Sequence, residues 1–528
     1  LPLAIRLAGA RLAHRPRWRV ADLVRRLGEA VLPELAVEDR TVGNAFALSY
    51  GQLSGSTRRF FSLLGLHPAA SLDAPAAAAL SGLPLDEAGD LLDELVDVHL
   101  LEEPEPGVYR MHDLLREFAA ALAAGLPAED RDRAVLGVLN LETHALTASV
   151  ARSYRRALEH DLREVPDLRP ELVAAIADPV ARLERHRPDL GSFLEAAVRS
   201  GHPAYAWWIP RAAWYLLYYR GYNQDVAVLH DRGFAIAREH GDDAGTAMMA
   251  NYGASVHYRN GAYEKARECL ELCIRLHERQ GDQVAVAGAY GNLASIEFVM
   301  GRYAETVETA SKSLRISLRV GFAGYALAAH TQLSRAHGRL GNYAEALRLD
   351  RLRLLMASHD GDHLKASSLL QIQRHKRRLG RATPENARRY VEIALAMSVR
   401  RGLSVMEAEA RTDLGTILAE LGDFEAALAE HRRAVEISGQ TSFAAELLHD
   451  YAATLHRSGD VPAAREAYER SLRIAREVRQ PYSVARALAG IAGCLDAADP
   501  QRRRLRAEAL ALFEQMGVPE RFSVRDPA

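Results

Sequence analysis

The chain has 528 residues, of which 48% are hydrophobic and 26% are charged, and its formal net charge is −2. This length exceeds what one compact core supports, so several domains or a linear array of repeats are expected. The near balance of 67 basic and 69 acidic residues excludes a general affinity for polyanions. No apolar run approaches the roughly 20 residues that cross a bilayer, and no signal pattern opens the sequence. We therefore expect a cytoplasmic protein with no membrane partner.

The first 125 residues predict two helical segments, 1–40 and 41–125. Two short helices are indicated within residues 1–30, and helical spacing predicts further ones at 42–48, 56–64, 74–81 and 85–98. A β-hairpin follows, with strands at 99–103 and 108–112 and a turn at 104–107. Helices that end in a two-stranded wing are typical of a winged-helix domain, which we assign to residues 41–125.

A recognisable motif, Met111-His112-Asp113, stands between this hairpin and a helix expected to begin at Leu114 with Asp113 as its cap. Together with Leu1-Pro2-Leu3-Ala4, Ala47-Leu48-Ser49-Tyr50, Phe60-Phe61 and Tyr109-Arg110, the motif resembles the ARC half of an NB-ARC nucleotide switch, the module of STAND-class ATPases. The resemblance implies that His112 reaches the ADP phosphates and that Pro2 contacts the adenine. Residues 1–40 would then be a helical remnant of the NB-ARC module.

Other parts of such a switch are missing from the sequence. No Gly-x-x-x-x-Gly-Lys-Ser/Thr loop occurs, nor an apolar strand ending in Asp that would hold magnesium. Leu1 falls about where the nucleotide-binding core of that family ends. ADP or ATP is therefore expected only in the context of a core outside this chain. Because no other catalytic motif occurs either, the chain alone is not expected to be an enzyme.

DNA binding by the predicted winged helix is disfavoured by its charge. Residues 40–110 contain four arginines against ten acidic residues. Since contacts to phosphates dominate affinity for DNA, an acidic module repels it. DNA is expected as a partner only through a domain outside this chain.

Residues 126–200 form a predicted helical connector, which Pro166, Pro170, Pro179 and Pro188 break into short pieces. Aromatic residues then crowd the start of the next segment, between Trp207 and Tyr222. Packing of a capping helix against the first repeat explains them, and an aromatic ligand pocket is the alternative.

A repeat with a period of about 40 residues occupies positions 201–500. It has a glycine, an aromatic residue two positions later and a small residue three further on: Gly261, Tyr263, Ala266; Gly301, Tyr303, Thr306; Gly341, Tyr343, Ala346; Gly422, Phe424, Ala427. A small residue lies seven positions before each glycine. A second set of glycines half a period away is often followed by aspartate, as at Asp242, Asp282 and Asp362, which suits helix caps.

Each repeat is thus predicted to be two helices of roughly 17 residues, with the small residues at their crossing and the aromatic residue wedged between neighbouring pairs. This resembles the tetratricopeptide repeat (TPR) family. The predicted fold class is all-α, a TPR superhelical solenoid after a winged helix with a small β-hairpin. Residues 501–528 would be a capping helix and tail.

Two further groups of side chains stand out in the repeats. Arg374, Lys376, Arg377 and Arg378 form the densest basic cluster, which is either a solvated helix face or a docking patch for an acidic partner. Cys269 and Cys273 lie four positions apart, but two thiols are too few for a structural zinc site. Small buried side chains are the better interpretation, and no metal site is expected.

An NB-ARC segment followed by long TPRs resembles AfsR-type regulators of the Streptomyces antibiotic regulatory protein class. The resemblance implies a sensor and autoinhibitory half of a transcriptional regulator. Its repeats would bind a protein, a peptide or a small ligand, and it would form a homo-oligomer on activation. The alternative is a freestanding TPR scaffold that binds a partner peptide, with no role in nucleotide or DNA binding.

Overall fold

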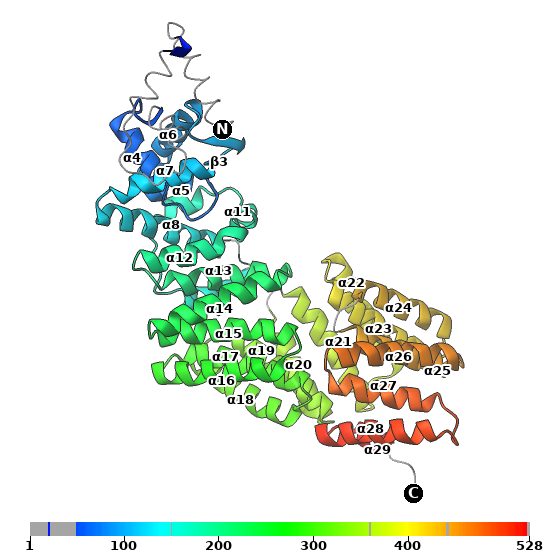
Figure 1. Ribbon diagram of the computed structural model, residues 1–528. Coiled ribbons are helices and arrows are strands. Elements are labelled where there is room, and N and C mark those ends of the chain that lie inside the picture. Colours follow the sequence, from blue (N-terminus) through cyan, green and yellow to red (C-terminus); the bar gives the residue numbers. More distant parts are fainter. Residues whose placement is uncertain are drawn as a thin grey trace. The chain divides into compact units, whose positions relative to one another are not determined.

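The computed structural model describes residues 19–21, 49–148, 150, 152–357, 361–439 and 443–524, which are helical almost throughout (Figure 1). They fall into two compact units, 1–253 and 254–528. The boundary lies within one helix, α15 (Asp243–Arg259). The expected all-α class is confirmed. Of the predicted N-terminal elements, the helix at 42–48 and most of residues 1–30 lie outside the described residues.

The first unit begins with three helices close to their predicted positions, α4 (Gly55–Leu64), α5 (Ala74–Ser81) and α6 (Leu85–Asp97). The side chains of Ser54 and Asp73 cap α4 and α5, because they accept hydrogen bonds from backbone N–H groups at 3.1 and 2.9 Å. Phe60 and Phe61 of α4 are buried together with Phe118 of α7 (Asp113–Ala124). Local capping, the apolar faces of α4 and α6, and the nearly complete burial of α5 thus account for this small core.

A three-stranded antiparallel sheet lies beside these helices, in the order β1 (Ser71–Leu72), β3 (Val108–Arg110), β2 (Glu102–Glu105). The predicted hairpin is present, but its first strand begins at Glu102 and not at His99. The reason is that His99 takes a left-handed φ of 62°, and Leu100 and Leu101 turn into the core. The pairing of β1 with β3 had no sequence signal, and the winged-helix assignment stays a prediction.

The remainder of the first unit is a series of helices, two of which begin at a proline. They are α8 (Ala128–Ala148), α9 (Arg152–Asp161), α10 (Pro170–Ala174), α11 (Pro179–His186), a 3-10 turn η1 (Arg187–Asp189), α12 (Leu190–Arg199), α13 (Tyr205–Tyr219) and α14 (Asn223–Glu239).

A buried ionic network joins α5, α8 and α11. Arg182 donates from Nε to the Asp73 carboxylate at 2.8 Å and also pairs with Glu142, whose carboxylate lies 3.0 Å from Nδ1 of His186. The Arg182, Glu142 and His186 side chains are at most 2% exposed. Because Asp73 also caps α5, this network fastens the N-terminal module to the connector.

The aromatic residues at the start of the predicted repeats pack between helices. A Cβ on Gly245 of α15 would lie only 2.7 Å from the Trp207 indole, so glycine permits the close approach of α13 and α15. Trp214 stacks on Tyr218 at 4.9 Å and lies 5.0 Å from Tyr252, between ring centres. These contacts favour the packing explanation over an aromatic ligand pocket.

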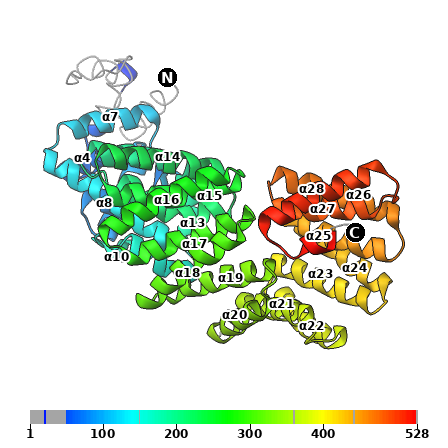
Figure 2. The ribbon, with the colours of Figure 1, turned by 90° about the horizontal axis from the view of Figure 1, so that it is seen from below.

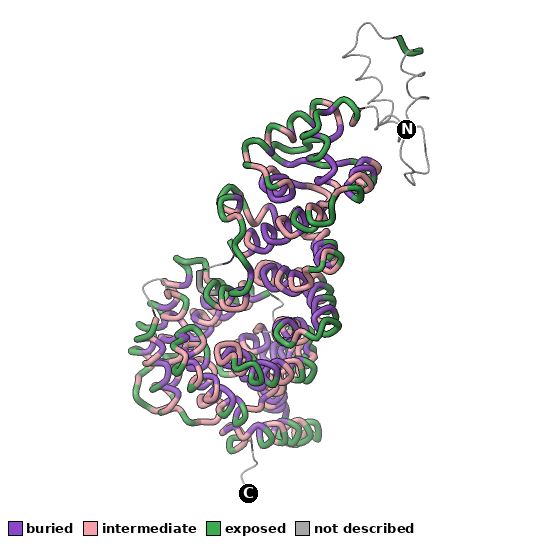
Figure 3. The backbone as a smooth tube through the Cα atoms, turned by 90° about the vertical axis from the view of Figure 1, so that its left-hand side faces the viewer, coloured by how far each residue is buried: buried purple, intermediate pink, exposed green. Residues whose placement is uncertain are grey.

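The second unit consists of antiparallel helix pairs, and many of the helices have 17 residues, as the repeat predicted. The helices are α16 (Tyr263–Gln280), α17 (Gln283–Val299), α18 (Tyr303–Arg319), α19 (Ala323–Arg339), α20 (Tyr343–Met356), α21 (Asp362–Arg378), α22 (Pro384–Arg400), α23 (Ser404–Glu420), α24 (Phe424–Ser438), α25 (Ala444–Arg457), α26 (Val461–Glu477), α27 (Pro481–Gly493), α28 (Pro500–Met516) and α29 (Glu520–Val524). Figure 3 shows buried and exposed stretches alternating along them, as stacked amphipathic helices require.

The turns follow the glycine pattern, with one exception. Gly261, Gly301, Gly341 and Gly422 have φ between +66° and +87°, a range that favours glycine. Asp242 and Asp282 cap the next helices as predicted, through hydrogen bonds from backbone N–H groups at 2.6 and 3.0 Å. Asp362 does not: Gly361 is the N-cap with φ −90°, and the Asp362 carboxylate pairs with Arg401 at 2.7 Å instead.

Small residues lie at the crossings of paired helices, as predicted. Ala266, Ala346 and Ala427 are fully buried, and so is Ala294 opposite Thr306. At Gly415 even a methyl group would lie 2.9 Å from the Ala427 carbonyl oxygen. The paired helices therefore approach closely because these positions carry little or no side chain.

The row of helix pairs curves back on itself, so that its two ends meet (Figure 2). Phe298 and Tyr303 from α17 and α18 share one buried cluster with Tyr482, Phe513 and Met516 from α27 and α28. The aromatic residue after each glycine was predicted to pack between neighbouring helix pairs. At Tyr303 the ring also contacts Tyr482, which lies near the other end of the array. No helix in the described ranges is long and apolar enough to cross a membrane.

Candidate functional site

The inner face of the second unit lines an open cavity of about 690 Å³. Its walls come mainly from the first helix of each pair, namely α15, α17, α19, α21, α23, α25 and α27. The second helices of the pairs lie mostly outside this ring. A solenoid of paired helices therefore places one helix of every repeat around a single space.

Charged residues enter the cavity in pairs spaced four apart, which is the spacing that places two side chains on one helix face. The pairs are Arg335 and Arg339, Arg374 and Arg378, Glu409 and Asp413, Glu446 and Asp450. In each arginine pair, the first residue lies six positions and the second two positions before the glycine that follows the helix. In each acidic pair, the first residue lies thirteen positions and the second nine positions before the glycine of its repeat. This recurring register is a sequence signal that the repeat analysis did not use.

Ion pairs join the helices around the cavity. Arg374 of α21 donates from Nε to both carboxylate oxygens of Asp413 in α23, at 2.8 and 2.9 Å. Arg339 of α19 donates to both oxygens of Glu446 in α25, at 2.8 and 3.0 Å, although 107 positions separate the two residues. The second pair therefore spans the ring and holds opposite walls together.

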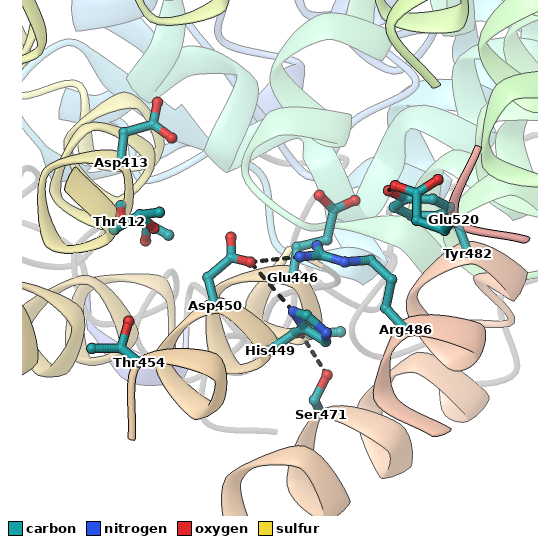
Figure 4. Close-up of polar contacts among 12 residues, drawn as sticks. Thr412, Asp413, Glu446, His449, Asp450, Thr454, Ser471, Tyr482, Arg486 and Glu520 are labelled. Atoms are coloured by element: carbon teal, nitrogen blue, oxygen red, sulfur yellow. Dashed lines mark hydrogen bonds and ion pairs between the residues drawn. The ribbon is translucent and has the colours of Figure 1, made fainter. Parts of the chain in front are cut away.

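A third set of contacts lies on α25, α27 and α29 (Figure 4). Arg486 donates to Asp450 at 2.6 Å, and His449 lies 3.3 Å from the same carboxylate. Burial opposes the charged form of Asp450, but Arg486 and His449 outweigh it and hold its pKa well below the usual value. The hydroxyl of Tyr482 donates to Glu520 at 2.7 Å. Its ring lies 3.8 Å from the guanidinium carbon of Arg339, a cation–π contact.

For other carboxylates of the cavity, burial shifts the pKa more than the neighbouring positive charges do. Burial raises the pKa of Asp413 despite the facing Arg374. It also raises the pKa of Glu409, whose contact with Arg374 is longer, at 3.9 Å. At Glu446, by contrast, Arg339 and Arg486 outweigh burial and lower the pKa. The cavity thus holds both firmly charged and easily protonated carboxylates.

The predicted basic cluster is divided by helix geometry. Arg374, Arg377 and Arg378 line the cavity, and Arg377 pairs with Glu420. Lys376 is not among the lining residues, and its ammonium group lies 5.8 Å from the ring centre of Tyr390. Three of the four residues proposed as a partner patch therefore face the interior of the ring.

The residues of the Met-His-Asp motif lie in the first unit. Met111 is buried, while His112 and Asp113 are exposed. The prediction that Asp113 caps a helix beginning at Leu114 is wrong: α7 begins at Asp113, and Nδ1 of His112 accepts a hydrogen bond from the Leu114 N–H at 3.4 Å. The histidine itself is the cap because its backbone, and not that of Asp113, is extended. Pro2 lies outside the described residues.

Possible metal ligands and thiols give no further site in the described ranges. No group of three or more His, Cys, Asp or Glu side chains there is arranged to hold a metal ion. Cys273 is buried and Cys269 is half-buried, and neither forms a disulfide. The cavity of the second unit and the helix cap formed by His112 therefore remain as the two candidate functional sites.

Comparison with known proteins identifies the repeats. A tetratricopeptide repeat model matches residues 285–354, and a second matches 246–279 and 408–441. The chain is 46% identical over 125 residues to the regulatory protein AfsR of Streptomyces coelicolor, which is 23% of this chain and 13% of that protein. It is 42% identical over 166 residues to AfsR of Streptomyces griseus, or 30% of this chain and 17% of the relative. The matched segments thus span less than a fifth of either relative.

The fold also has a solved counterpart. A STAND protein with a tetratricopeptide repeat sensor from Pyrococcus horikoshii superposes with a TM-score of 0.55, covering 97% of this chain and 73% of that one. At 15% identity this similarity shows the fold alone. The chain therefore contains tetratricopeptide repeats and is similar, over part of its length, to the AfsR regulatory proteins.

Proposed function

We propose that this chain is the sensor part of an AfsR-like regulator of the STAND class. Its repeats would bind a protein, a peptide or a small ligand, and the N-terminal module would relay the bound state to an ADP/ATP switch. In this proposal the described residues bind and transmit, while ATP hydrolysis and DNA binding belong to other domains.

The observation that carries the proposal is the cavity at the centre of the repeats. Its opposite walls are joined by the Arg339–Glu446 pair, which a bound ligand could reorganise. A ligand shifts an equilibrium only if it binds one state better than the other, and ion pairs that it replaces or strengthens supply that difference. The similarity to AfsR and the shared fold with a STAND protein that has a TPR sensor support the same assignment.

Two contacts support a relay through the first unit. The Asp73–Arg182–Glu142 network fastens the N-terminal module to the connector, so a movement of one displaces the other. In the N-terminal module, Nδ1 of His112 accepts a hydrogen bond from the Leu114 N–H, which leaves Nε2 as the ring nitrogen that can donate. An N–H group in that position is suited to donate to a phosphate oxygen.

The test uses the regulator with its nucleotide-binding core, purified with His112→Ala or His112→Asn. Asparagine is a good N-cap whereas alanine is not, and losing a cap costs about 1 kcal/mol. We expect both variants to retain less ADP, and only His112→Ala to weaken α7 in hydrogen exchange. Full ADP occupancy in both variants would contradict the relay and favour the scaffold alternative.

A further inference from the structure

The outer helices of the repeats carry a feature that the proposed sensor function does not use. The helices α18, α20 and α22 follow one another along one side of the row of helix pairs (Figure 2). Because successive helices alternate in direction, these three run the same way. Beyond their first turns they expose arginines and aliphatic side chains, which together we call the arginine face: Arg315, Leu318, Arg319, Arg351, Leu355, Met356, Arg389, Ile393, Val399 and Arg400.

The positive charges of the arginine face are not balanced within the chain. The neighbouring carboxylates are already paired with other cations, as in Glu308–Lys312, Glu345–Arg348 and Glu392–Arg388. No carboxylate of the described residues lies within 4 Å of any of the five arginines of the face. The other exposed carboxylates of these helices, Glu305 and Glu385, lie in the first turns. A partner would therefore meet five unpaired guanidinium groups.

The aliphatic side chains between these arginines indicate the kind of partner. Leu355 is 81% exposed and Leu318 is 63% exposed, so a partner that covers them removes apolar surface from water. A nucleic acid backbone offers charge but little apolar surface, whereas arginine next to apolar side chains is typical of contacts between proteins. The composition of the face therefore favours an acidic protein surface.

The chain itself has such a surface in its first unit. Residues 85–105, on α6 and β2, contain nine acidic residues and no arginine or lysine. Asp90, Asp97 and Glu105 are exposed, and no Lys or Arg side chain of the described residues lies within 4 Å of them. Pro104 and Pro106 are exposed beside Glu105 and can provide apolar contact. We call this segment the acidic face.

We propose that the arginine face of one copy of this chain binds the acidic face of a second copy. Surfaces of opposite charge attract and orient each other during the encounter. Because the two faces are different surfaces, the contact is head-to-tail, and each copy keeps one face for a further copy. The contact uses neither the cavity nor a nucleotide, so it goes beyond the proposed sensor function and does not depend on it.

Sedimentation velocity of the whole chain over a range of concentrations tests the proposal. We expect association that weakens as the salt concentration rises, because salt screens exposed charges. One variant reverses the acidic face, and a second reverses the arginine face. Each alone should associate about tenfold more weakly or less, because three attractive pairs become repulsive. The changes are Asp90→Lys, Asp97→Lys and Glu105→Lys in the first variant, and Arg315→Glu, Arg351→Glu and Arg389→Glu in the second.

A mixture of the two variants identifies the partner as a second copy. The first variant keeps its arginine face and the second keeps its acidic face, so association should return in the mixture. A mixture as monomeric as either variant would overturn the contact between copies, and so would a wild type that does not associate at all. Circular dichroism checks that both variants keep the Tm of the wild type, as expected for exposed side chains without partners.

A matched control and a second probe complete the test. Arg275→Glu, Arg473→Glu and Arg504→Glu make the same change of charge at exposed positions of α16, α26 and α28, and this control should associate like the wild type. An equal loss in the control would assign the effect to net charge and overturn the proposal. Binding of a short DNA duplex that only the reversed arginine face abolishes would assign the face to nucleic acid instead. The His112 variants leave these readings unchanged, so the two proposals fail separately.

Discussion

The hydroxyl of Tyr263 donates a 2.6 Å hydrogen bond to the carbonyl oxygen of Val478, 215 positions further along the chain. Beside it, Arg479 donates to the carbonyl oxygen of Gly261 at 3.3 Å. Both contacts join a turn near the start of the repeats to the turn between α26 and α27. They show that the second unit closes on itself through specific bonds as well as through the apolar cluster.

Replacing Tyr263 by phenylalanine should loosen this closure. The change removes one partly buried hydrogen bond and leaves the ring in place, so we expect the free energy of unfolding of the second unit to fall by about 1 kcal/mol. Hydrogen exchange should become faster around residues 476–482. Tyr290→Phe is the matched control, since its hydroxyl bonds to Glu278 at the surface. Equal effects of the two changes would contradict a role of Tyr263 in closure.

The helix crossing at Gly415 should not tolerate a methyl group. A Cβ there would lie 2.7 Å from the His431 ring and 2.9 Å from a backbone oxygen, so Gly415→Ala should destabilise the second unit by about 1–3 kcal/mol. Gly89 lies within α6 with nothing within 4 Å of its built Cβ. Gly89→Ala should therefore be neutral or stabilise by up to about 1 kcal/mol. Thermal unfolding by circular dichroism measures both, and a neutral Gly415→Ala would show that α23 and α24 can separate.

Ionisation of Glu297 should cost the second unit stability as the pH rises from about 4.5 to 7. Burial raises the pKa of Glu297 to about 7. Between these values the unfolded chain releases a proton that the folded chain keeps, which costs about 3 kcal/mol in total. The side chain is consistent with a protonated group, because Oε1 accepts a 3.2 Å hydrogen bond from Thr309 while Oε2 is buried without a partner.

Glu297→Gln checks this assignment. An amide keeps the neutral shape, so the variant should be more stable than the wild type at pH 8, and this difference should grow between pH 4.5 and 7. Urea unfolding at several pH values measures the difference. The same slope in both proteins would place the effect on another group.

The first unit should respond to pH in the opposite direction. Burial opposes ionisation of Glu142, but Arg182 and His186 outweigh it and lower its pKa to about 2, while burial lowers the pKa of His67 to about 3. Stability from His67 is therefore lost as the pH falls from about 6.5 towards 3, and that from Glu142 is lost below about 4.5. All four tryptophans precede residue 254, so their fluorescence reports this unit alone.

Glu142→Gln should leave Arg182 buried with Asp73 as its only carboxylate partner. Breaking such a pair costs about 3–5 kcal/mol at neutral pH, and the variant should then lose less further stability below pH 4.5. The same acid profile in Glu142→Gln and in the wild type would show that Glu142 does not contribute, and would leave the buried His67 and His230 as the source of the acid response.

The fold of the repeats was predictable because its signals are local. The glycines, caps and small residues recur in each repeat, and each acts on neighbours within one helix pair. Where the local sequence allowed two arrangements of a helix cap, the prediction was wrong. At His112-Asp113 either residue could cap α7, and at Asp362 an ion pair with Arg401 competes with the cap.

The cavity was beyond the sequence analysis because its contacts depend on the curvature of the whole array. Nothing near Arg339 in the sequence indicates Glu446, since only the closed ring brings α19 and α25 together. The basic cluster was treated as one surface, yet Arg374 and Arg378 share a helix face that Lys376 does not. Applying the four-residue spacing to charged residues as well as to apolar ones would have found the inner face.

Closure of the ring also limits how such a protein can change in length. An open solenoid can gain or lose a repeat at modest cost, because each pair contacts only its neighbours. Here Tyr263 and Val478 meet only when the right number of helix pairs lies between them. Duplication or deletion of one pair would break the closure and remove the cavity. The repeat number of this unit is therefore fixed by its geometry, and variation should be confined to side chains on a constant frame.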